Sequence, residues 1–197
     1  GSDINLHGRD RGGWGLTGGV TFYNSSVNLS HCKFYKSFAE DALNIVSSRF
    51  SLSESNFSSN TSDGVDGDFV EGIIQNCTFN SIGGDALDFS GSKIKIRNMI
   101  ASEIADKAVS IGENSYVKIE GAEINNVGYG IASKDLSNVE AYDIFINNAK
   151  IAAVAAYQKK ELFGPSRINL ERTKITKSLT KFLVQEKSTA IINGEEI

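Results

Sequence analysis

Apolar and polar residues alternate over short stretches of this chain, as in KIKI at 93–96 and VKI at 117–119. A period of two residues is typical of a β-strand whose two faces meet different surroundings. Gly, Asn, Asp and Ser fill the gaps between these stretches and supply turn conformations. The pattern therefore predicts many short strands joined by tight turns, without helices.

A second, longer period runs through the same stretches, because equivalent positions recur every 22 residues. Successive segments open at Asp41, Asp63, Asp85 and Lys107, with Tyr129 next in register. Three apolar columns follow this period: Leu43, Val65, Leu87, Val109, Ile131 and Ala153; Leu52, Ile74, Ile96, Ile119 and Ala141; and Phe34, Phe57, Phe79, Ala101, Ile124 and Ile146. A fixed repeat of this kind predicts a solenoid in which the columns fill the core.

The length of the repeat selects among solenoids and related folds. Propeller blades need about 40 residues, and leucine-rich repeats would show a fixed Leu/Asn consensus. Three short strands in each repeat fit an all-β, right-handed parallel β-helix of about eight coils, with roughly 22 residues per coil. The left-handed form would need a regular six-residue period, which is absent. Residues one repeat apart would then stack about 4.8 Å from each other.

Length and composition limit the possible domain organisation and the possible partners. The 197 residues suit one domain, and the opening Gly1-Ser2 has the appearance of a cloning scar, so we expect 3–197 to be a single β-helix domain excised from a longer protein. The net charge of −4 argues against nucleic acid as a partner. No apolar run is long enough for membrane insertion, and no signal peptide is visible. We therefore expect partners among the other domains of the longer parent chain.

Two polar columns are the candidate site. Beside the acids that open each segment, a column of Asn44, Asp66, Asp88 and Ser110 is expected to point outward on one side of the solenoid. The candidate catalytic residues are Asp66, Asp88, Lys107 and Lys134, and the candidate substrate-binding residues are Asp68, Asp85, Glu113, Asp135, Tyr157 and Lys159. The coil that contains Tyr157 is seven residues longer than the others and could wall one side of a groove.

Stacked carboxylates repel, so their pKa values should separate unless a cation intervenes. Four roles stay open for them. They could hold Ca²⁺, perform acid/base chemistry on a sugar, be neutralised or assisted by Lys107 and Lys134, or stabilise turns by accepting backbone N–H groups. No metal site and no cofactor are assigned beyond the Ca²⁺ alternative.

Two further columns have structural interpretations. Ser92, Ser115 and Ser137 follow the same strand in successive coils and are expected to form a turn ladder. Cys32 and Cys77 would lie two coils apart, which is beyond disulfide reach, so both are interpreted as buried small residues.

The segments DALNI, SDGVDGDF, GGDALDFSGS, DKAVSIGENS and GIASKDLS resemble the right-handed parallel β-helix repeat class with a pectin lyase-like fold, whose members include carbohydrate-binding and sugar-hydrolase modules. More narrowly, GGWGLTGGVTFY, ASKDLS and AYQKK resemble β-helix segments of large bacterial cell-surface proteins, some with a CotH-type region. The resemblance implies a polysaccharide ligand and an extracellular, cell-surface or periplasmic location. An enzyme of this class would be a polysaccharide lyase, an epimerase or a glycoside hydrolase.

A comparison with polygalacturonase-type hydrolases shows where the chain departs from that pattern. NTSDGVD places Asp63 near the first acid, but GGDA has Ala86 in place of the second. Lys107 in ADKA replaces the expected histidine, and Lys134 in ASKD lacks the accompanying arginine. The hydrolase mechanism is therefore not carried over. The leading hypothesis is a domain that binds or modifies a polysaccharide through an Asp/Lys-lined groove; the alternative is a non-catalytic spacer or an adhesin-like protein-interaction module.

Overall fold

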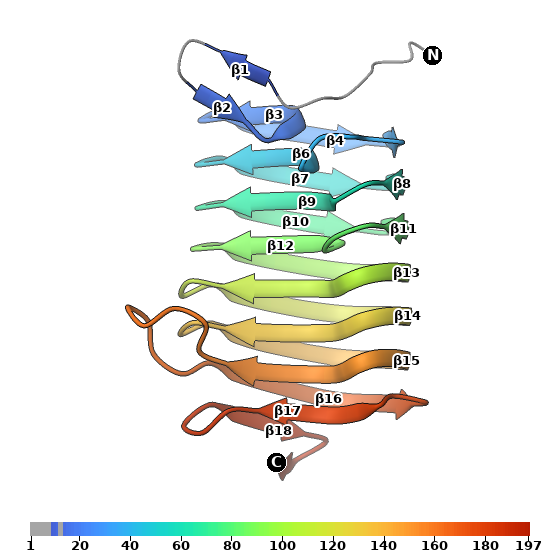
Figure 1. Ribbon diagram of the computed structural model, residues 1–197, viewed down its shortest axis with the longest axis vertical. Helices are drawn as coiled ribbons and strands as arrows, with labels where there is room; N and C mark the ends of the chain where they lie inside the picture. The colour runs from blue at the N-terminus through green and yellow to red at the C-terminus, as the bar shows by residue number, and fades with distance from the viewer. Residues whose placement is uncertain (1–8, 12–13) are drawn as a thin grey trace.

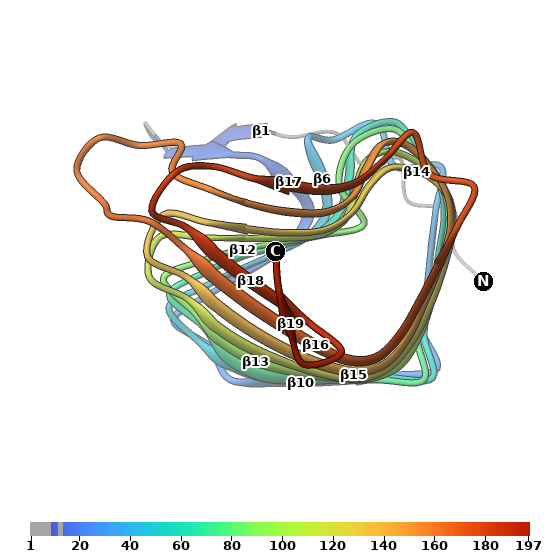
Figure 2. The ribbon, with the colours of Figure 1, turned by 90° about the horizontal axis from the view of Figure 1, so that it is seen from below.

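The computed structural model describes residues 9–11 and 14–197. The regular secondary structure in these ranges consists of β-strands, without a helix. The chain winds upon itself as a parallel β-solenoid of about eight coils, with the described N-terminal strands at one end and the C-terminus at the other (Figure 1). Seen along its axis, the solenoid has three sides (Figure 2). These observations confirm the predicted fold class.

The strands sort into three faces. The first face contains β3 (Gly18–Tyr23), β6 (Asp41–Val46), β9 (Asp63–Asp68), β12 (Leu87–Ser90), the last parts of β13 (Lys93–Gly112), β14 (Tyr116–Lys134) and β15 (Asn138–Tyr157), and β17 (Thr180–Val184). The second face contains β4 (Val27–Ser30), β7 (Arg49–Ser53), β10 (Glu71–Gln75), the first parts of β13, β14 and β15, β16 (Arg167–Thr176) and β18 (Thr189–Ile192).

The third face contains β5 (Lys33–Tyr35), β8 (Asn56–Asn60), β11 (Thr78–Ile82), the middle parts of β13, β14 and β15, and the end of β16. Two antiparallel additions complete the fold. One is the hairpin of β1 (Arg9–Arg11) and β2 (Trp14–Leu16); the other is β19 (Glu195–Glu196), which pairs with β18. In every coil, tight turns direct the chain from one face to the next, so each face is a stack of parallel strands.

The predicted apolar columns fill the core. Leu52 pairs in register with Ile74, and the column continues through β13, β14 and β15 as predicted. Aromatic rings stack along the third face: the centroids of Phe34 and Phe57 lie 4.5 Å apart, and those of Phe57 and Phe79 4.9 Å apart. Because each coil repeats the same inward positions, a large side chain in one coil packs directly against its counterpart in the next.

One column departs from its prediction. The residue opposite Ile131 is Val154, whereas Ala153 was expected. The register between β14 and β15 shifts by one residue between Val127 and Tyr129, so the following pairs are 23 residues apart. The extra residue is taken up as a β-bulge, and the larger, β-branched Val154 fills the core position at this level.

The serine ladder is confirmed at the corner between the first and second faces. The hydroxyl of Ser115 accepts the backbone N–H of Ser92 at 2.8 Å, and that of Ser137 accepts the N–H of Ser115 at 3.1 Å. Both cysteines are free, as expected. Cys77 is buried as predicted, whereas Cys32 is only half-buried, which corrects that part of the prediction.

The predicted scar Gly1-Ser2 lies outside the described residues. Within the described part of the chain there is no helix of the length and apolarity needed to cross a bilayer.

Candidate functional site

The outward column on the first face stacks as the 22-residue period predicts. Asn44 pairs with Asp66, Asp66 with Asp88, and Asp88 with Ser110, each on the neighbouring strand. The Asn44 side-chain amide donates a hydrogen bond to Asp66 Oδ2 at 2.7 Å. Asp66 and Asp88 are therefore direct neighbours, with their backbones about one strand spacing, ~4.8 Å, apart.

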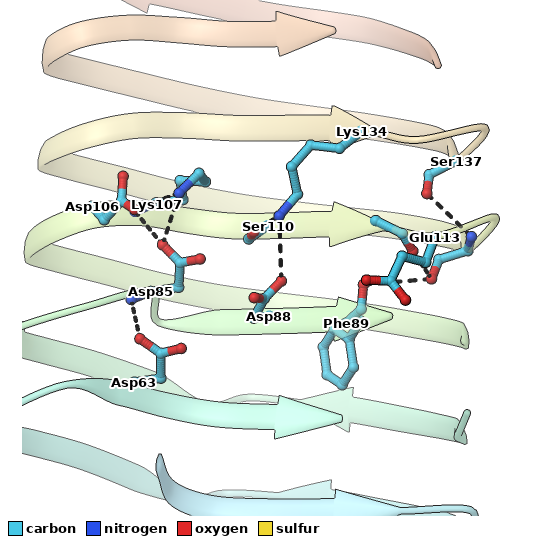
Figure 3. A network of polar contacts seen from close by, with 12 residues as sticks. Asp63, Asp85, Asp88, Phe89, Asp106, Lys107, Ser110, Glu113, Lys134 and Ser137 are labelled. Atoms are coloured by element: carbon cyan, nitrogen blue, oxygen red, sulfur yellow. Dashed lines mark hydrogen bonds and ion pairs between the residues drawn. The ribbon is translucent and has the colours of Figure 1, made fainter. Parts of the chain in front are cut away.

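The column that opens each segment also stacks, and its acids accept backbone N–H groups. Asp63 Oδ1 accepts the N–H of Asp85 at 2.8 Å, and Asp85 Oδ1 accepts the N–H of Lys107 at 2.8 Å (Figure 3). The Lys107 ammonium lies 3.5 Å from Asp85 Oδ1, is ion-paired with Asp106, and lies 5.7 Å from the centroid of the Tyr129 ring. Asp63 and Asp85 thus perform the turn-stabilising role that was one of the open alternatives.

A hollow of about 420 Å³ lies over the N-terminal half of this face. We call it the acidic hollow; its lining contains six carboxyl groups, from Glu40, Asp41, Asp63, Asp66, Asp68 and Asp88. Gly15 of β2 and Thr17, which follows it, line the hollow as well. Three of the predicted site residues, Asp66, Asp68 and Asp88, are brought together here.

Burial keeps protons on several of these acids. Burial, with added repulsion from Asp41, Asp68 and Asp88, raises the pKa of Asp66 from 3.8 to about 8. Burial also raises the pKa of Asp85 to about 7, although the nearby Lys107 ammonium opposes the rise. At neutral pH the Asp66 carboxyl group is therefore mostly protonated, and it can donate as well as accept a hydrogen bond.

The same burial raises the pKa of Asp41 and of Asp63 to about 6; hydrogen bonds that these two carboxylates accept, from Thr17 and from the Asp85 backbone, limit the rise. Burial also raises the pKa of Asp68, and repulsion from Glu113 and Asp88 raises it further, whereas the Lys160 ammonium lowers it. The acidic hollow is thus a cluster in which uptake of a proton relieves both desolvation and mutual repulsion.

Among the described residues, Lys134 is the cation that forms an ion pair with Asp88. Its side chain is 8% exposed. Its Nζ donates a hydrogen bond to Ser110 Oγ at 2.8 Å and lies 3.7 Å from Asp88 Oδ1. The lysine reaches back along the face, past Ser110, toward Asp88 (Figure 3). Asp88 Oδ1 is a buried atom that accepts no hydrogen bond from any described residue, so this ammonium balances its charge.

For Lys107, burial alone would lower the pKa, but Asp85 and Asp106 raise it above its ordinary value. A lysine held in its charged form favours the neutralising role over that of a general base.

The remaining predicted residues lie toward the C-terminal end of the face. Asp135, 1% exposed, accepts the backbone N–H groups of Lys159 and Lys160 at 2.6 and 2.7 Å, while Lys160 forms an ion pair with Glu113. These contacts hold the insertion after Tyr157, which projects beyond the three-sided outline of the solenoid (Figure 2). The insertion was predicted, but seven of the ten predicted site residues do not line the acidic hollow: Asp85, Lys107, Glu113, Lys134, Asp135, Tyr157 and Lys159.

Some functional candidates escaped the sequence interpretation. Lys160 was not singled out, because its partner Glu113 is 47 residues away, which is not a multiple of the repeat. Asp41 and Asn44 belong to the two predicted polar columns but were not named as catalytic or substrate-binding residues; both line the hollow, as their 22-residue spacing from Asp63 and Asp66 indicates.

Three carboxylates could contribute to a cation site. Asp63, Asp85 and Asp88 each offer one oxygen atom, and these atoms lie within 4.8 Å of one another. Oxygen donors suit a hard cation such as Ca²⁺. Such an ion would have to compete with the ammonium groups of Lys107 and Lys134, which already lie beside Asp85 and Asp88.

Two comparisons with known proteins bear on the chain. A family model described as a right-handed β-helix region matches residues 18–162, which covers most of the solenoid. The search of curated proteins finds no match.

Proposed function

The chain belongs to the right-handed β-helix family, and on that premise we propose that its acidic hollow binds a polysaccharide and cleaves it, with Asp66 as the proton donor. The observation that carries the proposal is the placement of Asp66 directly beside Asp88, whose Oδ1 lies 3.7 Å from the Lys134 ammonium. Burial, which raises the pKa of Asp66 to about 8, supports its role as the donor. Pairs of acids whose surroundings assign them different roles are characteristic of acid-catalysed glycoside chemistry.

The lining of the hollow supports binding of sugar hydroxyl groups. Protonated carboxyl groups and the amide of Asn44 both donate and accept hydrogen bonds, which matches the chemistry of a hydroxylated chain. A polyanion would find no cationic side chain among the lining residues and would be repelled by the carboxyl groups that are ionised, so the sugars that occupy the hollow are uncharged. We further propose that the domain works outside the cytoplasm, as part of a longer surface protein.

The proposed reaction uses the close spacing of the two acids. Asp66 gives its proton to the glycosidic oxygen as the bond from that oxygen to the anomeric carbon breaks, and an Asp88 oxygen bonds to that carbon. Water then hydrolyses the resulting ester, Asp66 takes the proton from the water, and Asp88 is released as a carboxylate. A spacing of about 5 Å between the carboxyl groups is the arrangement that retains the anomeric configuration.

The test is to incubate the domain with a panel of neutral polysaccharides and to measure binding by affinity electrophoresis and cleavage by the appearance of reducing ends. The unmodified chain is expected to bind and to release reducing ends, whereas Asp66→Asn binds but no longer cleaves. Asp143→Asn, an exposed acid paired with Arg172 elsewhere on the surface, is the matched control and retains both properties.

Two results would count against the proposal. Binding without any products would refute the proposed catalysis and leave a recognition or spacer module. Failure to bind any glycan of the panel would refute the proposal that a polysaccharide is the ligand. Repeating the assay on polygalacturonate with EDTA and with added Ca²⁺, and following unsaturated products, distinguishes a calcium-dependent lyase, which acts on uronate chains, from the hydrolase proposed above.

A further inference from the structure

Two hollows meet at the corner where the first face turns into the second. One, of about 550 Å³, lies beside the serine ladder, and the other, of about 520 Å³, extends over the second face. Arg49, Glu71, Lys93 and Tyr116 line both of them, so they form one continuous concave surface, which we call the basic corner. No residue of the acidic hollow lines it.

An aromatic residue occupies a backbone position in this corner that does not suit it. At the turn between the first and second faces, successive coils contain a residue in the left-handed region: Ser47, Phe69, Gly91 and Asn114, with φ of 50°, 54°, 60° and 61°. Glycine and asparagine adopt this conformation readily, whereas a bulky side chain there is an outlier.

The aromatic ring at this position is largely exposed, so burial contributes little to its stability. The side chain of Phe69 is 64% exposed, and its ring lies over Gly91, where an added Cβ would come within 2.6 Å of it. Phe69 therefore gains little from burial while it occupies a strained backbone position. A costly, exposed aromatic residue in a hollow is better explained by contact with a ligand than by folding.

The charge of the corner is opposite to that of the acidic hollow. The hollow on the second face is lined by four cations, Arg49, Lys93, Lys95 and Lys118, against one carboxylate, Glu71. Glu120, which is not part of this lining, forms ion pairs with Lys95 at 2.9 Å and with Lys118 at 3.3 Å, and positive charge still exceeds negative charge here. Lys93 forms no ion pair with any described residue, and Arg49 is paired with Glu71 only at the exposed surface, at 3.3 Å. In a chain of net charge −4, this local excess of positive charge favours an anionic ligand.

A second ring completes the surface. Tyr116 lies directly after Lys93 in the same outward column, is 36% exposed, and its hydroxyl group is hydrogen-bonded to Glu140 on the neighbouring strand. Exposed aromatic rings beside polar groups are suited to stacking on the apolar face of a sugar ring. Asn114 and the exposed Ser25, Ser26 and Ser47 line the same hollow and can bond to sugar hydroxyls.

We propose that the basic corner binds a negatively charged polysaccharide. Sugar rings stack on Phe69 and Tyr116, and the carboxylate or sulfate groups of the chain bind Arg49 and Lys93. The ligand runs along the solenoid axis, because the rings and cations come from successive coils of the same corner. This site is separate from the acidic hollow and stands whether or not that hollow cleaves a glycan.

The test compares the binding of three soluble chains: polygalacturonate, which is carboxylated, dextran sulfate, which is sulfated, and neutral dextran. We expect binding to one or both polyanions, weakening as salt is added, and little binding to dextran. Phe69→Asn should weaken the affinity about fivefold or more while leaving the thermal midpoint unchanged or higher, because Asn suits the left-handed position. Lys93→Gln should weaken binding and reduce its dependence on salt.

Matched controls come from the far side of the solenoid. Tyr35→Asn removes an exposed ring from the third face, and Lys150→Gln removes an exposed lysine; neither should change polyanion binding. The proposal is overturned if Phe69→Asn and Lys93→Gln bind as tightly as the unmodified chain, or if neutral dextran binds as well as the polyanions. It is also overturned if Asp66→Asn changes polyanion affinity and the corner variants do not, because the ligand would then lie on the acidic face.

Discussion

Replacing Asp66 with asparagine should stabilise the folded domain, and increasingly so as the pH rises. The pKa of this carboxyl group is 3.8 for an unperturbed aspartate and about 8 in the fold, where burial and its acidic neighbours disfavour the charge. The folded state therefore holds the proton more tightly than the unfolded chain does. Stability is complete below about pH 4 and falls as the pH rises toward 8, because the unfolded chain can release the proton and the folded chain cannot.

The expected magnitude follows from the size of the shift. One pKa unit corresponds to about 1.4 kcal/mol, so at pH 7 the folded state bears a penalty of about 4 kcal/mol relative to pH 4. Asparagine is nearly isosteric with the protonated acid, carries no charge and can still accept the hydrogen bond from Asn44. The Asp66→Asn chain should thus match the unmodified chain near pH 4 and exceed it in free energy of unfolding by about 4 kcal/mol at pH 7.

The assay is urea denaturation followed by circular dichroism at several pH values from 4 to 8, with Asp143→Asn as the control. The salt bridge from Arg172 lowers the pKa of Asp143 in its exposed position, so its removal should not stabilise the chain at any pH. If Asp66→Asn is equally or less stable than the unmodified chain throughout this range, the carboxyl group is ionised in the fold. The role of Asp66 as a proton donor would then have no basis.

Three further substitutions test other parts of the structure by the same denaturation assay. Phe79→Ala removes a fully buried ring from the aromatic stack and should cost about 3–5 kcal/mol; a loss below about 1 kcal/mol would mean that the stack is not packed as described. Lys134→Met leaves Asp88 without its counter-ion and should cost about 3 kcal/mol, most of which Asp88→Asn should restore in the double variant; strictly additive effects would contradict the ion pair. Ser115→Ala leaves the buried N–H of Ser92 without an acceptor and should cost about 1–3 kcal/mol, whereas an unchanged midpoint would argue against the ladder.

The sequence by itself determined the fold and most of the register. A strand period of two inside a repeat of 22 residues permits only a narrow set of solenoids, and a parallel stack of equal coils places residues one repeat apart on neighbouring strands. Asp66 and Asp88 could therefore be predicted as neighbours, and so could the serine ladder. Ala153 is the instructive failure, because one inserted residue at a bulge moves every later pair by one position.

The tertiary structure alone decided which polar residues share a site. Gly15 and Thr17 come from outside the repeats and line the acidic hollow. Lys134 donates a hydrogen bond to Ser110, which is 24 residues earlier in the chain, and forms an ion pair with Asp88 one coil farther on. The contacts of the insertion likewise join Glu113 to Lys160, which no repeat spacing connects. A backbone period specifies which residues lie side by side, but the direction and reach of long side chains, the path of insertions and the desolvation of each acid depend on everything packed around them.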